Sequence, residues 1–189
     1  MDIRLDNISK AYGDTVVLQG FSAVLGHGKT YILTGASGAG KTTLLHILLG
    51  LVPPDSGSVT KNVRFSAVFQ ENRLLPGRTA VDNLAFAAPK GTKKAVLSAL
   101  LQEILPAESL NKPIEQLSGG MCRRVAVARA MLSESDCVVM DEPFAGLDGD
   151  TVKTVVGFIF RHLRGRTLIL STHQPEALQD YPSEHIRLS

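Results

Sequence analysis

The stretch Gly35-Ala36-Ser37-Gly38-Ala39-Gly40-Lys41-Thr42 decides the fold of this chain. It fits the pattern G-x-x-x-x-G-K-S/T and lies between a predicted buried strand, Tyr31–Thr34, and a predicted helix from Lys41 to Leu49. Small side chains let successive backbone N–H groups surround a phosphate at the positive end of that helix. Lys41 would reach the outer phosphates, and the Thr42 hydroxyl could ligate Mg²⁺. A glycine-rich turn without a ligand is the alternative, but the flanking strand and helix favour nucleotide binding.

Short apolar runs alternate with helical periodicity on both sides of this loop, and this rhythm predicts an α/β fold. Antiparallel strands are predicted in the first thirty residues at Ile3–Ile8, Val16–Leu18 and Phe21–Leu25. Later strands are predicted at Val63–Phe69, Cys137–Met140, Thr167–Ser171 and, as an edge run, His185–Leu188. Helices are predicted at Lys41–Leu49, Thr79–Ala87, Lys93–Leu105, Gly119–Leu132, Asp150–Leu163 and after Pro175. The continuous apolarity of the later strands suits a parallel sheet that is covered on both faces.

Composition excludes several classes of protein. With 189 residues and 44% hydrophobic residues, the chain can bury a sizeable core as one domain. A net charge of +2 without a block of like charges argues against a surface built for nucleic acid or anionic lipid. The two cysteines, Cys122 and Cys137, are too few for a disulfide framework and are assigned to packing. The longest apolar stretch, Leu44–Val52, is far shorter than the roughly 18 residues of a membrane helix. Because Met1–Asn7 also lacks the plan of a secretion signal, we expect a cytoplasmic location.

Two adjacent carboxylates follow the apolar strand Cys137–Met140. Asp141 could bind Mg²⁺, and Glu142 could polarise a water molecule. Strand alternation predicts that the two side chains point to opposite sides. A strand that simply ends in solvated acids is common, but the phosphate loop in the same chain favours the catalytic interpretation.

The segment Leu117-Ser118-Gly119-Gly120-Met121 stands at the head of a predicted helix. Ser118 would cap that helix, whose N–H groups and dipole could face an anion. Because of this segment, the chain resembles the ATP-binding subunits of ABC transporters, whose signature loop is usually Leu-Ser-Gly-Gly-Gln. Met121 replaces the final Gln. The resemblance covers essentially the whole chain and implies a P-loop NTPase with a mostly parallel core sheet and an N-terminal antiparallel β subdomain. It also implies a helical subdomain inserted at approximately 72–132, all within one ATP-binding domain of residues 1–189.

The same resemblance implies roles for individual residues. Tyr12 would stack on adenine, and Asp148, in the loop Ala145-Gly146-Leu147-Asp148, would take part in communication between two copies. The ATP-binding residues of the loop would be Gly35, Ala36, Ser37, Gly38, Ala39, Gly40, Lys41, Thr42 and Thr43. Ligands of Mg²⁺ would be Thr42, Gln70 and Asp141, and catalytic residues would be Lys41, Glu142 and His173. A second copy would complete each site with Ser118, Gly119 and Gly120.

The resemblance further implies an ATPase that energises transport through separate membrane-spanning subunits. Its partners would be a second ATP-binding domain in a homodimer and an integral membrane permease that holds the chain on the inner face of the cell membrane. An extracytoplasmic substrate-binding protein is a further partner that the resemblance allows. Residues 69–76 are similar to importer ATPases of the nitrate, sulfonate and taurine group, which favours import.

A different class remains as the alternative, namely a non-transport ABC ATPase that acts on nucleic acid or ribosomes. Such proteins usually carry a coiled-coil insertion, a second ATPase domain or long basic linkers, and this sequence shows none of them. Lys90, Lys93 and Lys94 form only a modest basic cluster, so no nucleic acid partner is expected. A third possibility is a degenerate subunit that hydrolyses ATP poorly. The presence of Lys41 and Glu142 argues against it.

Overall fold

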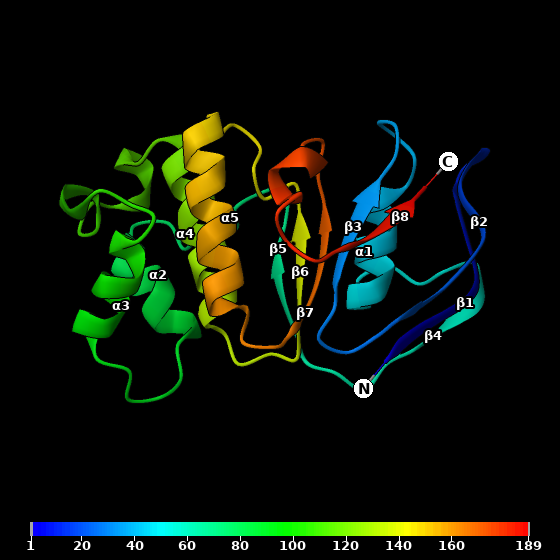
Figure 1. The fold of residues 1–189 in the computed structure, drawn as a ribbon, viewed down its shortest axis with the longest axis horizontal. Coiled ribbons are helices and arrows are strands. Elements are labelled where there is room, and N and C mark those ends of the chain that lie inside the picture. Colours follow the sequence, from blue (N-terminus) through cyan, green and yellow to red (C-terminus); the bar gives the residue numbers. More distant parts are fainter. Residues whose placement is uncertain (1, 189) are drawn as a thin grey trace.

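Two β-sheets organise the structure, a computed structural model that describes residues 2–188. The smaller sheet has the strand order β2-β1-β4, and the larger one has the order β5-β6-β7-β3-β8 (Figure 1). The strands are β1 (Ile3–Tyr12), β2 (Thr15–Leu25), β3 (Thr30–Thr34), β4 (Ser56–Thr60), β5 (Phe65–Val68), β6 (Cys137–Asp141), β7 (Thr167–Ser171) and β8 (Glu184–Arg187). Pairing is antiparallel in the smaller sheet and parallel in the larger one. The predicted α/β class and parallel core sheet are confirmed.

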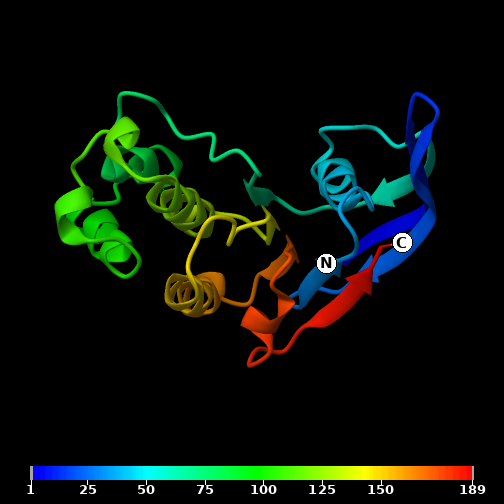
Figure 2. The ribbon, with the colours of Figure 1, turned by 90° about the horizontal axis from the view of Figure 1, so that it is seen from above.

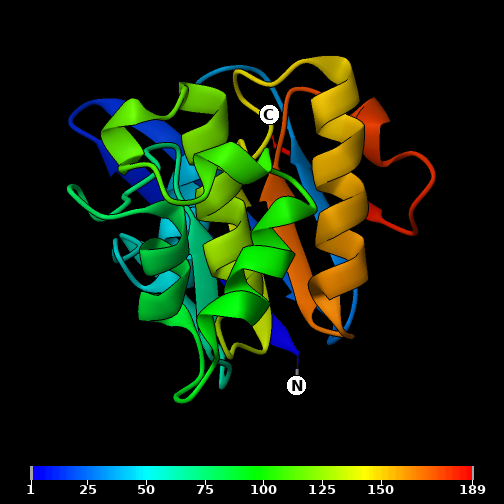
Figure 3. The same ribbon diagram turned by 90° about the vertical axis from the view of Figure 1, so that its left-hand side faces the viewer.

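The helices cover both faces of the parallel sheet. They are α1 (Lys41–Leu49), α2 (Ala80–Ala87), α3 (Lys94–Gln102), α4 (Gly119–Leu132) and α5 (Gly149–Leu163), with a short 3-10 turn at Pro175–Leu178. Helix α1 lies on the face of the antiparallel sheet, whereas α4 and α5 lie on the opposite face (Figures 1 and 2). Viewed from that side, α2 and α3 lie in front of α4, farther from the sheet (Figures 1 and 3). The predicted helices are therefore present, although α3 ends at Gln102 rather than Leu105.

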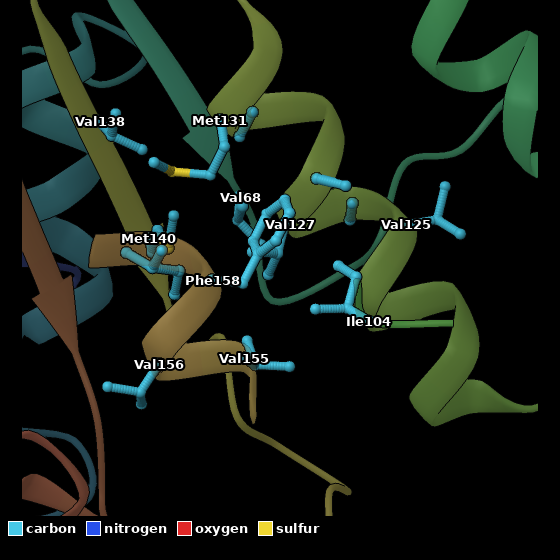
Figure 4. Packing of buried hydrophobic residues seen from close by; sticks show 14 of the residues in the cluster. Val68, Ile104, Val125, Val127, Met131, Val138, Met140, Val155, Val156 and Phe158 are labelled. Carbon is cyan, nitrogen blue, oxygen red and sulfur yellow. The ribbon is translucent and has the colours of Figure 1, made fainter. Parts of the chain in front are cut away.

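Strand β6 connects two hydrophobic cores because alternate side chains leave it on opposite faces. Val138 and Met140 pack with Phe158 of α5 and with residues of α4 (Figure 4). Cys137 and Val139 pack with α1 and the antiparallel sheet on the other face. All five residues of the strand are buried, which explains the continuous apolar run in the sequence.

The antiparallel sheet differs from the prediction at two places. The two runs predicted at Val16–Leu18 and Phe21–Leu25 form one strand, β2, in which Gly20 has φ +63 and donates its N–H to Ser9 Oγ. Strand β4 was not predicted, because its sequence Ser-Gly-Ser-Val-Thr is polar and mostly exposed. It forms because Val59 pairs with Leu5 of β1. No helix within residues 2–188 combines the length and the apolar character needed to cross a membrane.

Candidate functional site

A pocket of about 350 Å³ opens at the carboxyl ends of strands β3, β5, β6 and β7. Segments that are far apart in the sequence meet there, because parallel strands bring their carboxyl ends to one edge of the sheet. The lining residues are Tyr12, Val17, Ser37, Gly38, Gly40, Lys41, Thr42, Thr43, Gln70, Asp141, Glu142 and His173. Most of the residues singled out in the sequence are therefore brought together, and Gly35, Ala36 and Ala39 complete the loop without lining the pocket.

The loop that forms one wall needs glycine at two positions. Gly35 has φ +150, and a Cβ there would lie 2.5 Å from the carbonyl oxygen of Leu188. Gly40 has φ +88, and a Cβ there would lie 2.8 Å from the carbonyl oxygen of Val17. Gly40 is also the N-cap of α1, which has no side-chain cap, so the helix begins with backbone N–H groups beside the pocket. Such a helix end, preceded by a glycine loop, attracts phosphate.

Lys41 supplies the positive charge of the pocket. Its ammonium group donates to the carbonyl oxygens of Gly35 at 2.8 Å and Ala36 at 3.0 Å, which holds the side chain against the loop. The carboxylates of Asp141 and Glu142 line the same pocket. A polyphosphate that is accompanied by a divalent cation would match both the ammonium group and the carboxylates.

The two carboxylates lie in the same pocket, so the predicted opposite orientation is wrong. Asp141 is the last residue of β6, and its Oδ1 accepts a hydrogen bond from Ser171 Oγ at 2.6 Å. Glu142 has φ +50, which ends the strand alternation and turns its side chain into the pocket. Its Oε2 accepts the backbone N–H of His173 at 3.2 Å, and its Oε1 lies 3.4 Å from His173 Nε2.

The pocket has donors that suit Mg²⁺. Asp141 Oδ2 is buried without a hydrogen-bond partner among residues 2–188, in a pocket that the hydroxyl of Thr42 and the amide of Gln70 also line. These oxygen donors are of the hard type that Mg²⁺ prefers. The described part of the chain holds no cluster of three or more His, Cys, Asp or Glu residues able to bind a metal alone. A bound Mg²⁺ would therefore need phosphate oxygens and water as further ligands, which is usual for this ion.

Four predicted residues outside the phosphate loop do not line the pocket either. Ser118 is the N-cap of α4, and its Oγ accepts the N–H of Met121 at 3.2 Å. Asp148 is the N-cap of α5, and hydrogen bonds from the backbone and hydroxyl of Thr151 lower the pKa of its carboxyl group. Gly119 and Gly120 follow Ser118 at the head of α4, and Ser118 and Gly119 are exposed. This chain alone does not bring them to the phosphate loop.

Sequence reasoning missed two arginines of α4 that hold the Gln70 segment in place. Arg123 donates to the carbonyl oxygens of Phe69, at 2.6 Å, and Gln70. Arg129 donates to the carbonyl oxygens of Asn72 and Arg73. Burial lowers the pKa of Arg123. Arginines in a helix usually indicate a solvated face, so the sequence carries no signal that distinguishes them.

The chain is similar to known proteins in both sequence and structure. A family profile described as ABC transporter matches residues 18–145. The chain is 38% identical over 174 residues to the aliphatic sulfonates import ATP-binding protein SsuB of Corynebacterium glutamicum, across 88% of this chain and 71% of that protein. It is 36% identical over 185 residues to the cytochrome c biogenesis ATP-binding export protein CcmA of Gluconobacter oxydans, across 97% of this chain and 87% of that protein. A dimeric ATP-binding cassette in a post-hydrolysis state, bound to ADP and Pi, is similar in structure with a TM-score of 0.85. That alignment has 25% identity and covers 99% of this chain and 94% of the other.

Proposed function

The chain belongs to the ABC transporter family of ATP-binding domains, and we propose that it hydrolyses ATP to drive import through separate membrane-spanning subunits. The observation that carries this proposal is the pocket in which the phosphate loop, both carboxylates and His173 meet. The similarity to an import ATP-binding protein over 88% of the chain supports the direction of transport. We further propose that residues 1–189 form one ATP-binding domain, with a helical insertion at approximately 72–132.

The residues of the pocket have different roles in ATP hydrolysis. Lys41 and the loop N–H groups bind and orient the phosphates, and Tyr12 stacks on the adenine. Thr42, Gln70 and Asp141 would hold Mg²⁺, which supplies positive charge to the phosphate oxygens when bound. Glu142 orients the attacking water and accepts its proton, and His173 donates a hydrogen bond to the γ-phosphate as negative charge develops.

A second copy of the chain completes each site. The exposed Ser118 and Gly119 at the head of α4, followed by Gly120, would present N–H groups to the phosphate bound by the partner. Asp148 caps the neighbouring helix α5. The loop before that helix lies close to the head of α4. Leu147 Cδ2 is 3.1 Å from the position that a Cβ would occupy at Gly120. A change in one site could therefore reach Asp148 and the other copy.

Size-exclusion chromatography of Glu142→Gln tests the shared site. With Mg-ATP this variant should run as a dimer, because ATP binds but is not hydrolysed, and without nucleotide it should run as a monomer. The unmodified protein should release phosphate, and Lys41→Ala should lose tight ATP binding in calorimetry. A Glu142→Gln variant that binds ATP but remains monomeric would contradict the shared site.

The membrane partner would dock on the helices that follow Gln70. A groove of about 550 Å³ is lined by Leu75, Pro76, Arg78, Asp82, Ala85 and Phe86. The side chain of Phe86 is 77% exposed, as expected for a residue that a permease covers. We propose that this permease holds the chain at the inner face of the cell membrane. Aliphatic sulfonate is the substrate class that the name of the first relative suggests. An extracytoplasmic substrate-binding protein is a further partner in this proposal.

An export role is the second candidate, and one observation favours it. The chain is 36% identical to the cytochrome c biogenesis export protein over 97% of its own residues, compared with 38% over 88% for the sulfonate import protein. A deletion strain distinguishes the two. Loss of growth on aliphatic sulfonate as the sulfur source, with normal growth on sulfate, would support import. Loss of c-type cytochromes with normal growth on sulfonate would support export instead.

A further inference from the structure

Ser171 lies beside both carboxylates of the pocket without lining it. It is the last residue of β7 and is paired with Asp141 in the sheet, and its exposed fraction is 0%. Its hydroxyl donates to Asp141 Oδ1 at 2.6 Å. The same oxygen accepts the backbone N–H of Glu142 at 3.1 Å. One buried hydroxyl thus contacts the side chain of the first acid and the backbone of the second.

These two bonds determine where the acids point. With Oδ1 of Asp141 held by the hydroxyl, Oδ2 is the oxygen left buried without a hydrogen-bond partner among residues 2–188. Glu142 N donates to the backbone carbonyl oxygen of Ser171 as well, at 3.2 Å, so the hydroxyl and the backbone of Ser171 together hold Glu142 N where φ is +50 and the side chain turns into the pocket. A non-glycine residue rarely adopts this conformation without support from its surroundings. The hydroxyl therefore orients the free oxygen of Asp141 and supports the turn at Glu142 together.

We propose that Ser171 is a positioning residue that aims Asp141 Oδ2 at the divalent cation of the ATP complex and keeps Glu142 at the site of water attack. This inference rests on the Mg²⁺ site proposed above. Partners that hydrogen-bond to a metal-binding carboxylate typically contribute 10–100-fold to metal affinity or activity. Loss of the hydroxyl should therefore weaken binding of the cation about tenfold or more, without changing how the protein holds the nucleotide itself.

Three variants test the proposal. Ser171→Ala removes the hydroxyl, whereas Ser171→Thr retains it and suits a strand. Ser66→Ala is the matched control, because Ser66 is also a buried strand serine, with its hydroxyl 2.9 Å from Ser135 Oγ, and it does not line the pocket. Electron paramagnetic resonance would measure the binding of Mn²⁺ to each protein in complex with a non-hydrolysable ATP analogue. Calorimetry in EDTA would measure nucleotide binding without metal, and urea unfolding would check the fold.

The expected result is Mn²⁺ binding weakened about tenfold or more in Ser171→Ala and near the parental value in Ser171→Thr and Ser66→Ala. Nucleotide affinity in EDTA should be the same in all four proteins. Mn²⁺ binding by Ser171→Ala equal to that of the parent would overturn the proposal, provided that Asp141→Asn binds the ion weakly. If Asp141→Asn also binds Mn²⁺ as the parent does, the proposed metal site is wrong, and this inference falls with it.

Discussion

Replacing Arg123 by methionine should destabilise the protein through the segment that carries Gln70. Arg123 is 6% exposed, and its guanidinium group donates to the carbonyl oxygens of Phe69, at 2.6 Å, and Gln70. Methionine fills much of the same space with a flexible apolar chain but donates no hydrogen bond. Both carbonyl groups would lose a charged donor, while the packing around the side chain would be retained in large part.

The magnitude follows from two opposing effects. A hydrogen bond to a charged group contributes about 1.5–3 kcal/mol, so loss of both bonds costs roughly 3–6 kcal/mol. Burial of the charged guanidinium group lowers the free energy of unfolding, because the charge loses its contact with water, and the same burial lowers the pKa of Arg123. The methionine variant does not carry this cost. We expect a net loss of about 2–3 kcal/mol in the free energy of unfolding. Arg123→Lys, which can satisfy one carbonyl group as a point donor, should fall between the parent and Arg123→Met.

Urea unfolding measures this difference. At a slope of about 2 kcal/mol/M, a loss of about 2–3 kcal/mol moves the midpoint by about 1–1.5 M. Arg4→Met is the control, because Arg4 is exposed and makes no side-chain hydrogen bond or ion pair within residues 2–188. Equal midpoints for Arg123→Met and Arg4→Met would refute the conclusion that Arg123 holds the Gln70 segment in place.

Three further predictions concern other parts of the chain. Ser118→Arg should leave ATP binding to the monomer nearly unchanged in calorimetry but abolish phosphate release, whereas loss of monomer binding would contradict a role across the dimer. Burial opposes ionisation of Glu103, but hydrogen bonds from Arg161 and His162 outweigh it and lower the pKa. The carboxylate thus stabilises the fold above its unfolded pKa of about 4.3, and this contribution is lost as the pH falls through the lower folded value. Glu103→Gln should therefore be less stable than the parent at pH 7, and the two stabilities, measured by urea unfolding, should converge in acid. Burial raises the pKa of Cys137 to about 12, so iodoacetamide at pH 8 should alkylate this thiol only after unfolding, as mass spectrometry would show.

Local motifs explain why much of the site could be predicted from the sequence. The loop from Gly35 to Thr42 and the acids Asp141 and Glu142 each lie within a few consecutive residues, next to a strand whose apolar run is easily recognised. The fold then requires only that parallel strands bring their carboxyl ends together. Strand β4 was missed for the opposite reason, because its polar sequence forms a strand only where β1 offers an edge to pair with.

The sequence by itself determined the α/β class, the phosphate loop with its helix, and the residue types of the candidate ATP site, because these depend on short contiguous patterns. Only the tertiary structure decided that Asp141 and Glu142 share one pocket, since the turn at Glu142 depends on Ser171, a residue 29 positions away. It also decided that Arg123 holds the segment of Gln70, 53 positions away. Hydrogen bonds between distant segments leave no periodic pattern in a sequence, because their partners become neighbours only when the sheet and its helices are packed.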